Sequence, residues 1–483
     1  MKEAFFVHAC GAWLALFCAG LTVFSFHADP TGTREEILLL LALLGAMAAG
    51  YGTAVWRAVR RRARIPVKAV LAWAAVFRLL LFPSLPILET DYNRYLWDGF
   101  VLSHGVNPYM FAPETVLSDT IDSSLNPDQQ ESLRVLRGTA GAHPRARAVL
   151  EEVNNPETVT IYPPFAQILF GLAAWLFPLS LYGWRAVVMF FDALLIATLV
   201  LLLIRYQRDP AWVLIYAWSP LALKEIINTL HFDGIALSFL FLGILLASTN
   251  PGCRSAAAFA FAVLTKIIPI ALVPLWRDRL SRKAWGLFLL IIAMIAFMFS
   301  GVGARGLSGW VEFAQRWESN SSLVAFFEWA AGGLGAPAWG GGPVIVTILD
   351  FEFPCDAFFT AKSLAGGFFL AVLLFQIRIL YLRPDMEDEE RLARALAVNG
   401  ALLLCSPVCN PWYVVWMLPF MCFIPRISWL YLSVSCLLYY TFFIPDPRAY
   451  LTGMRELEYL PFFGLLAWEW RKKPKASKWI LSA

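Results

Sequence analysis

Long apolar runs dominate the chain, and charged residues are confined to short clusters between them. A run of about 18 or more apolar residues predicts a membrane span, because a hydrocarbon core about 30 Å thick needs about 20 helical residues. The runs are too long and too uniform for barrel strands, in which apolar and polar residues alternate over about ten positions. The pattern therefore predicts an all-α polytopic membrane protein.

The apolar runs predict about twelve transmembrane helices. They lie at about 5–25, 37–56, 69–88, 185–204, 210–223, 234–249, 284–302, 360–381, 393–408, 411–424, 428–444 and 456–470. The run from Ala256 to Trp276 is interrupted by Lys266 and two prolines, which favours a broken hairpin over a continuous span. The shorter run from Pro163 to Phe177 is expected to lie along the outer surface. Another crossing here would reverse the orientation of every later span and place the later basic clusters outside.

Composition and charge agree with a multi-pass protein of the inner membrane. Of the 483 residues 59% are hydrophobic and only 15% are charged, whereas soluble domains carry about a quarter charged residues. The densest basic cluster, at 57–68, should stay in the cytoplasm, which places the polar stretch from Glu89 to Thr160 outside. The basic clusters at 205–208, 277–283 and 471–478 then fall inside as well. The net charge of +4 is therefore a topology signal, and no nucleic-acid partner is expected.

Ionisable residues gather where the third predicted span meets the outer surface. If Asp91 to Ser103 is helical, Asp91, Arg94, Tyr95 and Asp98 share one face, at the i, i+3, i+4 and i+7 spacing. One interpretation is an ordinary interfacial loop, whose aromatic residues belong to the belt that membrane proteins carry at this depth. The other is a functional site that faces the outer aqueous phase.

Five segments, taken in order, favour the functional interpretation. They are ETDYNRYLWDGFVLSHGVNPYMFAPE from Glu89, IYPPFAQILF from Ile161, HFDG from His231, AVLTKIIPI from Ala262 and NPWYVVWMLPF from Asn410. Together they resemble the GT-C superfamily of membrane glycosyltransferases. Within it they are most similar to bacterial polyprenyl-phosphate-sugar-dependent mannosyltransferases and to the mannosyltransferase of GPI-anchor assembly. The resemblance covers the chain from about Leu88 to Phe420.

The resemblance implies a GT-C fold, with interfacial helices in a large extracytoplasmic loop, and an inverting hexosyltransferase. Its donor would be a polyprenyl-phosphate sugar, with mannose favoured, and its acceptor a glycan or glycolipid of the cell envelope. Members carry a modified DxD signature in the first outer loop, which Glu89-Thr90-Asp91 fits in its ExD form, so Asp91 is the expected catalytic residue. Such enzymes generally need no cofactor and no metal. The chain departs from the usual pattern in having two spans, not one, before the span that leads into this loop.

The chemistry suits these residue types. A donor that arrives on a prenyl tail needs no nucleotide site, and the chain has no GxxxxGK[ST] phosphate loop. A carboxylate placed against the acceptor hydroxyl can act as general base, while cationic groups stabilise the departing phosphate. A pair such as Glu89 and Asp91 could hold Mg²⁺ through water, but no His or Cys cluster offers a transition-metal site.

Several further polar residues are candidates for binding substrate, each with a structural alternative. His231 and Asp233 match an HxD position of the resembling family, although a histidine satisfied in an interfacial loop would look the same. Lys266 is an ammonium within an apolar run, which indicates a functional site or a side chain that snorkels to the interface. The candidate substrate-binding residues are Glu89, Arg94, Tyr95, Asp98, Lys224, His231, Asp233, Lys266 and Arg316.

The chain divides into three predicted parts. Residues 1–60 form an N-terminal transmembrane hairpin, 61–302 the catalytic module with outer loop 89–162, and 303–483 a second outer loop and the C-terminal spans. A transporter or flippase of lipid-linked sugars is the rival function. It would carry ionisable residues near mid-membrane, and Asp192 and Lys266 are the two that keep this alternative open.

Overall fold

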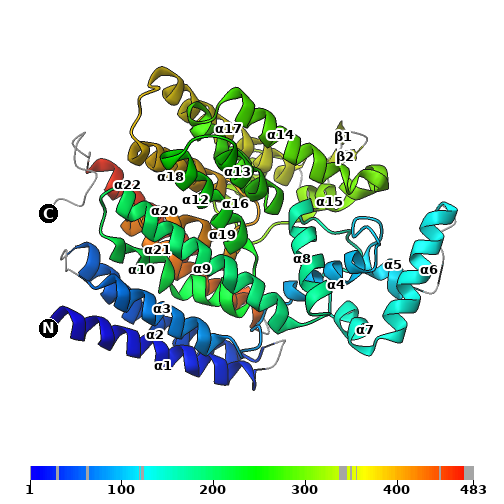
Figure 1. The fold of residues 1–483 in the computed structure, drawn as a ribbon, viewed down its shortest axis with the longest axis horizontal. Helices are drawn as coiled ribbons and strands as arrows, with labels where there is room; N and C mark the ends of the chain where they lie inside the picture. The colour runs from blue at the N-terminus through cyan, green and yellow to red at the C-terminus, as the bar shows by residue number, and fades with distance from the viewer. Residues whose placement is uncertain are drawn as a thin grey trace.

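The computed structural model describes residues 2–28, 32–60, 65–118, 120, 125–336, 345–348, 351–354, 356–444 and 448–472. These residues form a helical protein with one two-stranded hairpin (Figure 1). The basic residues predicted inside at 61–64 and 473–478, and part of the predicted second outer loop at 337–344, lie outside the described residues.

Three long helices at the N-terminus run side by side along one edge of the molecule (Figure 1). They are α1 (Lys2–Ser25), α2 (Arg34–Val59) and α3 (Val67–Leu81). A capping box starts α2: the Thr33 side chain accepts from the Glu36 backbone N–H, and the Glu36 carboxylate accepts from the Thr33 N–H. At the other end of α2, Arg57 pairs with Glu3 at 2.9 Å, so the end of this helix lies beside the start of α1.

The predicted outer segment is helical and stands away from both termini (Figure 1). Its helices are α4 (Asp91–Ser103), α5 (Pro113–Leu117), α6 (Pro127–Ala142) and α7 (Pro144–Glu151), and α8 (Pro164–Leu176) follows it. Proline begins four of them, where its missing N–H costs nothing. At Gly99 a Cβ would come within 2.4 Å of the Phe170 carbonyl oxygen, so this glycine lets α4 and α8 pack closely. The run from Pro163 to Phe177 is thus held against the outer segment.

The rest of the chain alternates long helices with short ones. The remaining α-helices are α9 (Leu181–Arg205), α10 (Leu214–Ala217), α11 (Pro220–Ala222), α12 (Asp233–Thr249), α13 (Cys253–Thr265), α14 (Arg282–Phe297), α15 (Ser308–Arg316), α16 (Leu323–Gly333), α17 (Ala357–Leu382), α18 (Asp388–Leu404), α19 (Pro411–Val414), α20 (Leu418–Met421), α21 (Ile427–Ser435) and α22 (Arg448–Arg471). A π-helical segment covers Leu223–Asn228. Short 3₁₀ helices cover Pro210–Val213, Ile268–Ala271, Val273–Arg279, Ser300–Leu307, Val415–Met417 and Cys436–Phe443. Strand β1 (Ile345–Ile348) pairs antiparallel with β2 (Phe351–Pro354), with Ile345 opposite Pro354.

Among the described residues, four helices are long and apolar enough to cross a membrane: Phe5–Ser25, Arg34–Val59, Leu181–Arg205 and Ala357–Leu382. A fifth crossing results if Pro220–Asn228 and Asp233–Thr249, which meet at 113°, form one broken span. A mainly helical chain with several helices able to cross a membrane is therefore confirmed, whereas twelve crossings and the GT-C fold stay predictions.

Several predicted spans are shorter or more broken than their apolar runs. The helix expected at 69–88 ends at Leu81, because prolines follow at 83 and 86. The runs at 210–223 and 411–424 are divided into short helices, again at prolines. The break expected within 256–276 is confirmed, since α13 ends at Thr265 and 3₁₀ turns follow.

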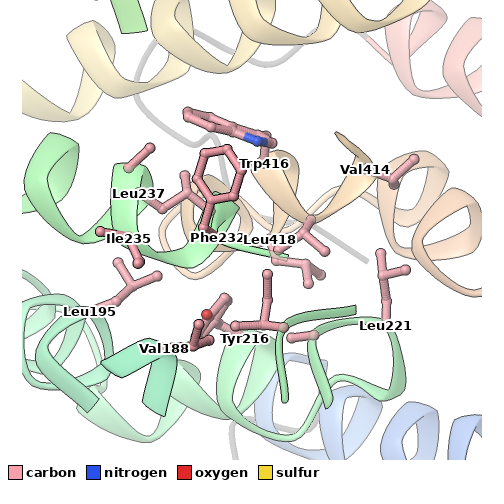
Figure 2. Close-up of a cluster of buried hydrophobic side chains, with 14 of the residues drawn as sticks. Val188, Leu195, Tyr216, Leu221, Phe232, Ile235, Leu237, Val414, Trp416 and Leu418 are labelled. Carbon is pink, nitrogen blue, oxygen red and sulfur yellow. The ribbon is translucent and has the colours of Figure 1, made fainter. Parts of the chain in front are cut away.

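One buried core connects the parts of the chain, reaching from Val7 on α1 to Phe462 on α22. Figure 2 shows a section where α9, α12 and the segment around Val414 to Leu418 meet, with Phe232 and Trp416 next to each other. In contrast, Phe297 on α14 and Phe375 on α17 are exposed, which fits helices whose outer faces contact lipid.

Ion pairs connect the helices in the core and at their predicted cytoplasmic ends. In the core, the guanidinium of Arg78 contacts the carboxylate of Asp192 at 2.5 Å, so that α3 is fixed to α9. At the predicted cytoplasmic ends of the helices, part of the acidic run from Asp385 to Glu390 forms ion pairs. Asp388 pairs with Arg279 at 2.8 Å, and Glu389 pairs with Arg208. These pairs bring together basic and acidic segments that the sequence analysis places on one side of the membrane.

Candidate functional site

A cavity of about 340 Å³ lies between the outer segment and the helices that follow it. Its polar lining comes from α4, from the stretch at 154–160 and from Lys266, Asn399, Ser406 and Asn410. Its apolar lining comes mainly from the turn after α13 and from the end of α18. Aromatic side chains complete the wall, and they are Tyr95, Tyr162, Phe232, Trp310, Phe313, Trp317, Phe369, Trp412, Tyr413 and Trp416. The cavity thus combines polar, aromatic and apolar surfaces, which suits a ligand with both a polar and an apolar part.

Asp91 is the first residue of α4 and forms part of the cavity wall, with 19% of its side chain exposed. Its carboxylate is favoured at this position because the helix dipole is positive at the N-terminus. Its Oδ1 accepts a hydrogen bond from Asn154 Nδ2 at 2.5 Å. Burial raises the pKa of Asp91, while the bond from Asn154 and the charges of Lys266 and Arg94 act in the opposite direction.

Arg94 holds in place the backbone that carries Asn154. Its guanidinium donates to the carbonyl oxygens of Asn154 at 3.3 Å, Asn155 at 2.9 Å and Thr158 at 3.0 Å. A guanidinium with five donors in a rigid plane suits such a task. Arg94 lines the cavity, but three of its donor contacts go to backbone. Its contribution to the site therefore includes positioning Asn154 against Asp91.

Lys266 brings an ammonium group into the cavity wall. Its Nζ donates to Asp233 Oδ2 at 2.7 Å, and Asp233 Oδ1 accepts from Trp416 Nε1 at 2.6 Å. The ammonium also lies 5.0 Å from the centre of the Phe232 ring and 4.8 Å from that of Tyr413, within the range of cation–π attraction. The side chain is thus fixed by partners within the protein and does not snorkel away to the interface.

A second group of ionisable residues lies behind the cavity wall and does not line it. The His231 ring is stacked on Trp412 with centroids 4.1 Å apart. Lys224 donates to the Ile87 carbonyl oxygen at 3.0 Å and to the Tyr440 hydroxyl at 2.9 Å, and that hydroxyl donates to Glu225 Oε1 at 2.6 Å. The Tyr440 hydroxyl therefore bridges Lys224 and Glu225.

Glu89, Asp98 and Arg316 also lie outside the cavity lining. Glu89 is buried, its Oε1 has no hydrogen-bond partner, and burial together with the Asp91 carboxylate raises its pKa well above the ordinary value. Asp98 faces α8, where it accepts from Gln167 Nε2 at 3.0 Å. Arg316 is exposed and pairs with Glu312 at 3.1 Å.

The predicted site residues thus separate into two sets. Asp91, Arg94, Tyr95 and Lys266 meet in the wall of one cavity, although 175 positions separate the first from the last. Asp233 supports this set through Lys266. The sequence analysis missed Asn154, for which the chain offers no signal, and it assigned no role to Trp412 and Trp416, although both lie in the segment NPWYVVWMLPF.

Two other chemical possibilities were tested against the geometry. Within the described residues, no group of three or more His, Cys, Asp or Glu side chains is arranged to hold a metal ion. The sequence Asn320-Ser321-Ser322 has the form of a glycosylation site, but Asn320 is buried and its amide donates to Glu458 at 3.0 Å. Asn320 therefore serves as a structural contact between the 318–322 turn and α22.

No known protein family, no curated protein and no solved structure matches this chain. The decisive features are a partly exposed carboxylate, a fixed ammonium group and an extended apolar wall within one enclosure.

Proposed function

We propose that this chain is an inverting glycosyltransferase. In this proposal it transfers a hexose, with mannose favoured, from a polyprenyl phosphate to a glycan or glycolipid acceptor at the extracytoplasmic face of the inner membrane. The observation that carries the proposal is the shared cavity, in which the Asp91 carboxylate, the Lys266 ammonium and apolar side chains line the same space. The resemblance of the quoted segments to the GT-C superfamily points in the same direction.

The reaction assigns one role to each charged group. Asp91 takes the proton of the acceptor hydroxyl as its oxygen attacks the anomeric carbon, and the bond from that carbon to the phosphate oxygen breaks. The phosphate leaves with the electron pair, and the ammonium of Lys266 stabilises the charge that develops on it. A single displacement inverts the anomeric centre, so only one carboxylate is needed for proton transfer, in contrast to a retaining mechanism.

The apolar side of the cavity is suited to a prenyl tail. Ile267 and Ile270 line the cavity, yet about half of each side chain is exposed on the protein surface. Together with Phe369, Leu402 and Leu403 they offer an apolar surface on which a lipid chain can lie. Such a surface would let the donor stay partly in the bilayer while its sugar phosphate enters the polar part of the cavity.

The rival function, a transporter, has less support. Asp192 contacts Arg78 and also accepts from the Tyr216 hydroxyl at 2.7 Å, so its charge is matched by fixed partners inside the core. Lys266 is likewise matched by Asp233. Ion pairs of this kind fix helices to one another, whereas a coupling-ion site needs an ionisable group that can exchange its partner.

The test is transfer by the purified protein in proteoliposomes. Undecaprenyl-phosphate-[³H]mannose is the donor and octyl α-mannoside the acceptor probe, and a labelled disaccharide product is expected. Label that crosses sealed vesicles without a new glycosidic bond would replace the proposal with the transporter function. No product and no crossing, in vesicles where the protein is folded, would contradict both functions for this donor.

The acid side of the pH profile gives a second test of Asp91. The base must be ionised, so kcat/KM should fall as pH drops through the Asp91 pKa, which burial raises. The hydrogen bond from Asn154 lowers that pKa, so Asn154→Ala should move the acid limb to higher pH. The measurement is kcat/KM against pH for the two proteins. A limb that stays in place, or moves to lower pH, would show that Asp91 does not set it.

A further inference from the structure

His231 lies between two carboxylates and outside the cavity wall. Its Nδ1 is 3.9 Å from Asp91 Oδ2, and its Nε2 is 3.7 Å from Glu225 Oε2. The side chain is 1% exposed, and Nε2 is buried without a hydrogen-bond partner. A buried ring nitrogen aimed at a carboxylate but not bonded to it needs an explanation.

The ring is held in this orientation by its neighbours. It stacks on Trp412 with an interplanar angle of 18°, and the Tyr95 hydroxyl lies 3.3 Å from Nδ1. When that hydroxyl donates to Nδ1, the ring hydrogen is on Nε2 and faces Glu225. Nδ1 is then the acceptor on the Asp91 side. Neither nitrogen contacts the cavity, so a direct role in binding substrate does not fit the location.

Glu225 is placed to receive a proton. Its side chain is fully buried, and it accepts hydrogen bonds from the hydroxyls of Tyr440 at 2.6 Å and Thr229 at 3.3 Å. The charged groups around His231 are the carboxylates of Glu89, Asp91, Glu225 and Asp233 and the ammonium groups of Lys224 and Lys266. Since carboxylates outnumber ammonium groups here, an added proton makes the net buried charge less negative.

We propose that His231 is a proton relay that connects Asp91 to Glu225. The inference rests on the proposed function. After transfer, the Tyr95 hydroxyl turns its hydrogen away from Nδ1, the Asp91 carboxylic acid gives its proton to that nitrogen, the Nε2 proton moves to the Glu225 carboxylate, and neutral imidazole remains with its hydrogen on Nδ1. Asp91 is again an anion, Glu225 is a carboxylic acid, and no charge is created or lost. The two gaps exceed hydrogen-bond length, as is common for catalytic contacts before substrate binds.

The relay would act on the step after glycosidic bond formation. By microscopic reversibility, a protonated Asp91 next to the product is the acid that catalyses the reverse reaction. Moving the proton to Glu225 removes that acid while product still fills the cavity. When product leaves, water enters, the ring returns the proton by the same path and Asp91 releases it.

His231→Gln and Glu225→Gln test the relay, because both keep polar contacts but cannot carry the proton. The initial rate of the first turnover, measured by rapid quench with undecaprenyl-phosphate-[³H]mannose and octyl α-mannoside, should stay within about twofold of wild type. Because the proton stays on Asp91 next to the product, product should revert to donor and acceptor, so the amplitude of the first turnover should fall below that of the wild type and steady-state turnover should fall about a hundredfold. Imidazole should restore part of the steady-state rate of His231→Ala, since that variant leaves a space of the right shape on Trp412.

His104→Gln is the matched control, because this histidine is exposed at the end of α4 and far along the helix from Asp91. It should show neither a lower first-turnover amplitude nor a loss of steady-state turnover. Equal loss in the first and later turnovers of His231→Gln, without rescue of His231→Ala by imidazole, would overturn the relay and leave His231 a packing residue. If the wild type forms no product at all, the proposed function fails first, so the two failures are distinguishable.

Discussion

Replacing Asp91 by Asn is expected to lower turnover by at least about a hundredfold while the fold stays intact. Asn has the shape of Asp, and its Oδ1 can still accept the hydrogen bond from Asn154 that now reaches Asp91 at 2.5 Å. Its amide cannot take a proton from the acceptor hydroxyl. The measurement is steady-state transfer from undecaprenyl-phosphate-[³H]mannose to octyl α-mannoside, with circular dichroism to check the fold.

Asp128→Asn provides the matched control for this substitution. Asp128 is an exposed carboxylate in the first turn of α6, in the same outer segment but away from the cavity lining. Its replacement should leave turnover within about twofold, because a surface charge at a helix start affects only local stability. Wild-type turnover in Asp91→Asn would show that Asp91 is not the general base. Equal losses in both variants would indicate damage to the outer segment.

The local structure around Asp91 was predictable because it depends on neighbours in the sequence. Helical spacing placed Asp91, Arg94, Tyr95 and Asp98 on one face, and α4 does begin at Asp91 and end at Ser103. The spacing did not predict which residues that helix face contacts. Asp98 turns to Gln167 on α8, and Arg94 binds backbone carbonyl groups more than fifty residues away. These partners are set by tertiary packing, which a helical pattern does not contain.

The membrane-spanning helices were predictable where an apolar run has no break. Leu181–Arg205 and Ala357–Leu382 contain no proline and form single long helices. The run at 411–424 is equally apolar, but it forms α19, a 3₁₀ turn and α20. Pro411 begins the first of these, and Pro419 lacks the backbone donor that a continuous helix would use there. Hydropathy alone therefore overstates helix length. The broken segment instead supplies Trp412 and Trp416 to the site.

The ammonium of Lys266 shows how one residue can be located correctly without its role following from the sequence. A lysine within an apolar run was a candidate for function, and it does line the cavity. Its partner Asp233 lies 33 positions earlier on another helix. Pairing across helices holds the ammonium in place, and this geometry distinguishes a fixed group in the cavity wall from a snorkelling side chain.

The buried pair of Arg78 and Asp192 should account for the largest effect on stability. Arg78→Met leaves the Asp192 carboxylate without its cation in a fully buried position, which should cost about 3–5 kcal/mol. Arg78 also donates to the Ala217 carbonyl oxygen at 2.8 Å, so the variant loses a link between α3 and α10 as well. The free energy of unfolding can be compared by SDS titration in detergent, followed by circular dichroism.

Two further variants separate the charge from the packing. In Arg78→Met with Asp192→Asn no buried charge remains, and the Asn oxygen can still accept from the Tyr216 hydroxyl, so the double variant should be more stable than Arg78→Met. Arg383→Met removes a pair of similar length, 2.9 Å to Glu390, but 59% of the Arg383 side chain is exposed, so its loss should cost less than about 1 kcal/mol. A double variant no more stable than Arg78→Met would mean that the guanidinium acts through packing and not through charge. In that case the Asp192 carboxylate tolerates losing its partner, and Arg78 and Asp192 do not form the fixed ion pair that speaks against a transporter.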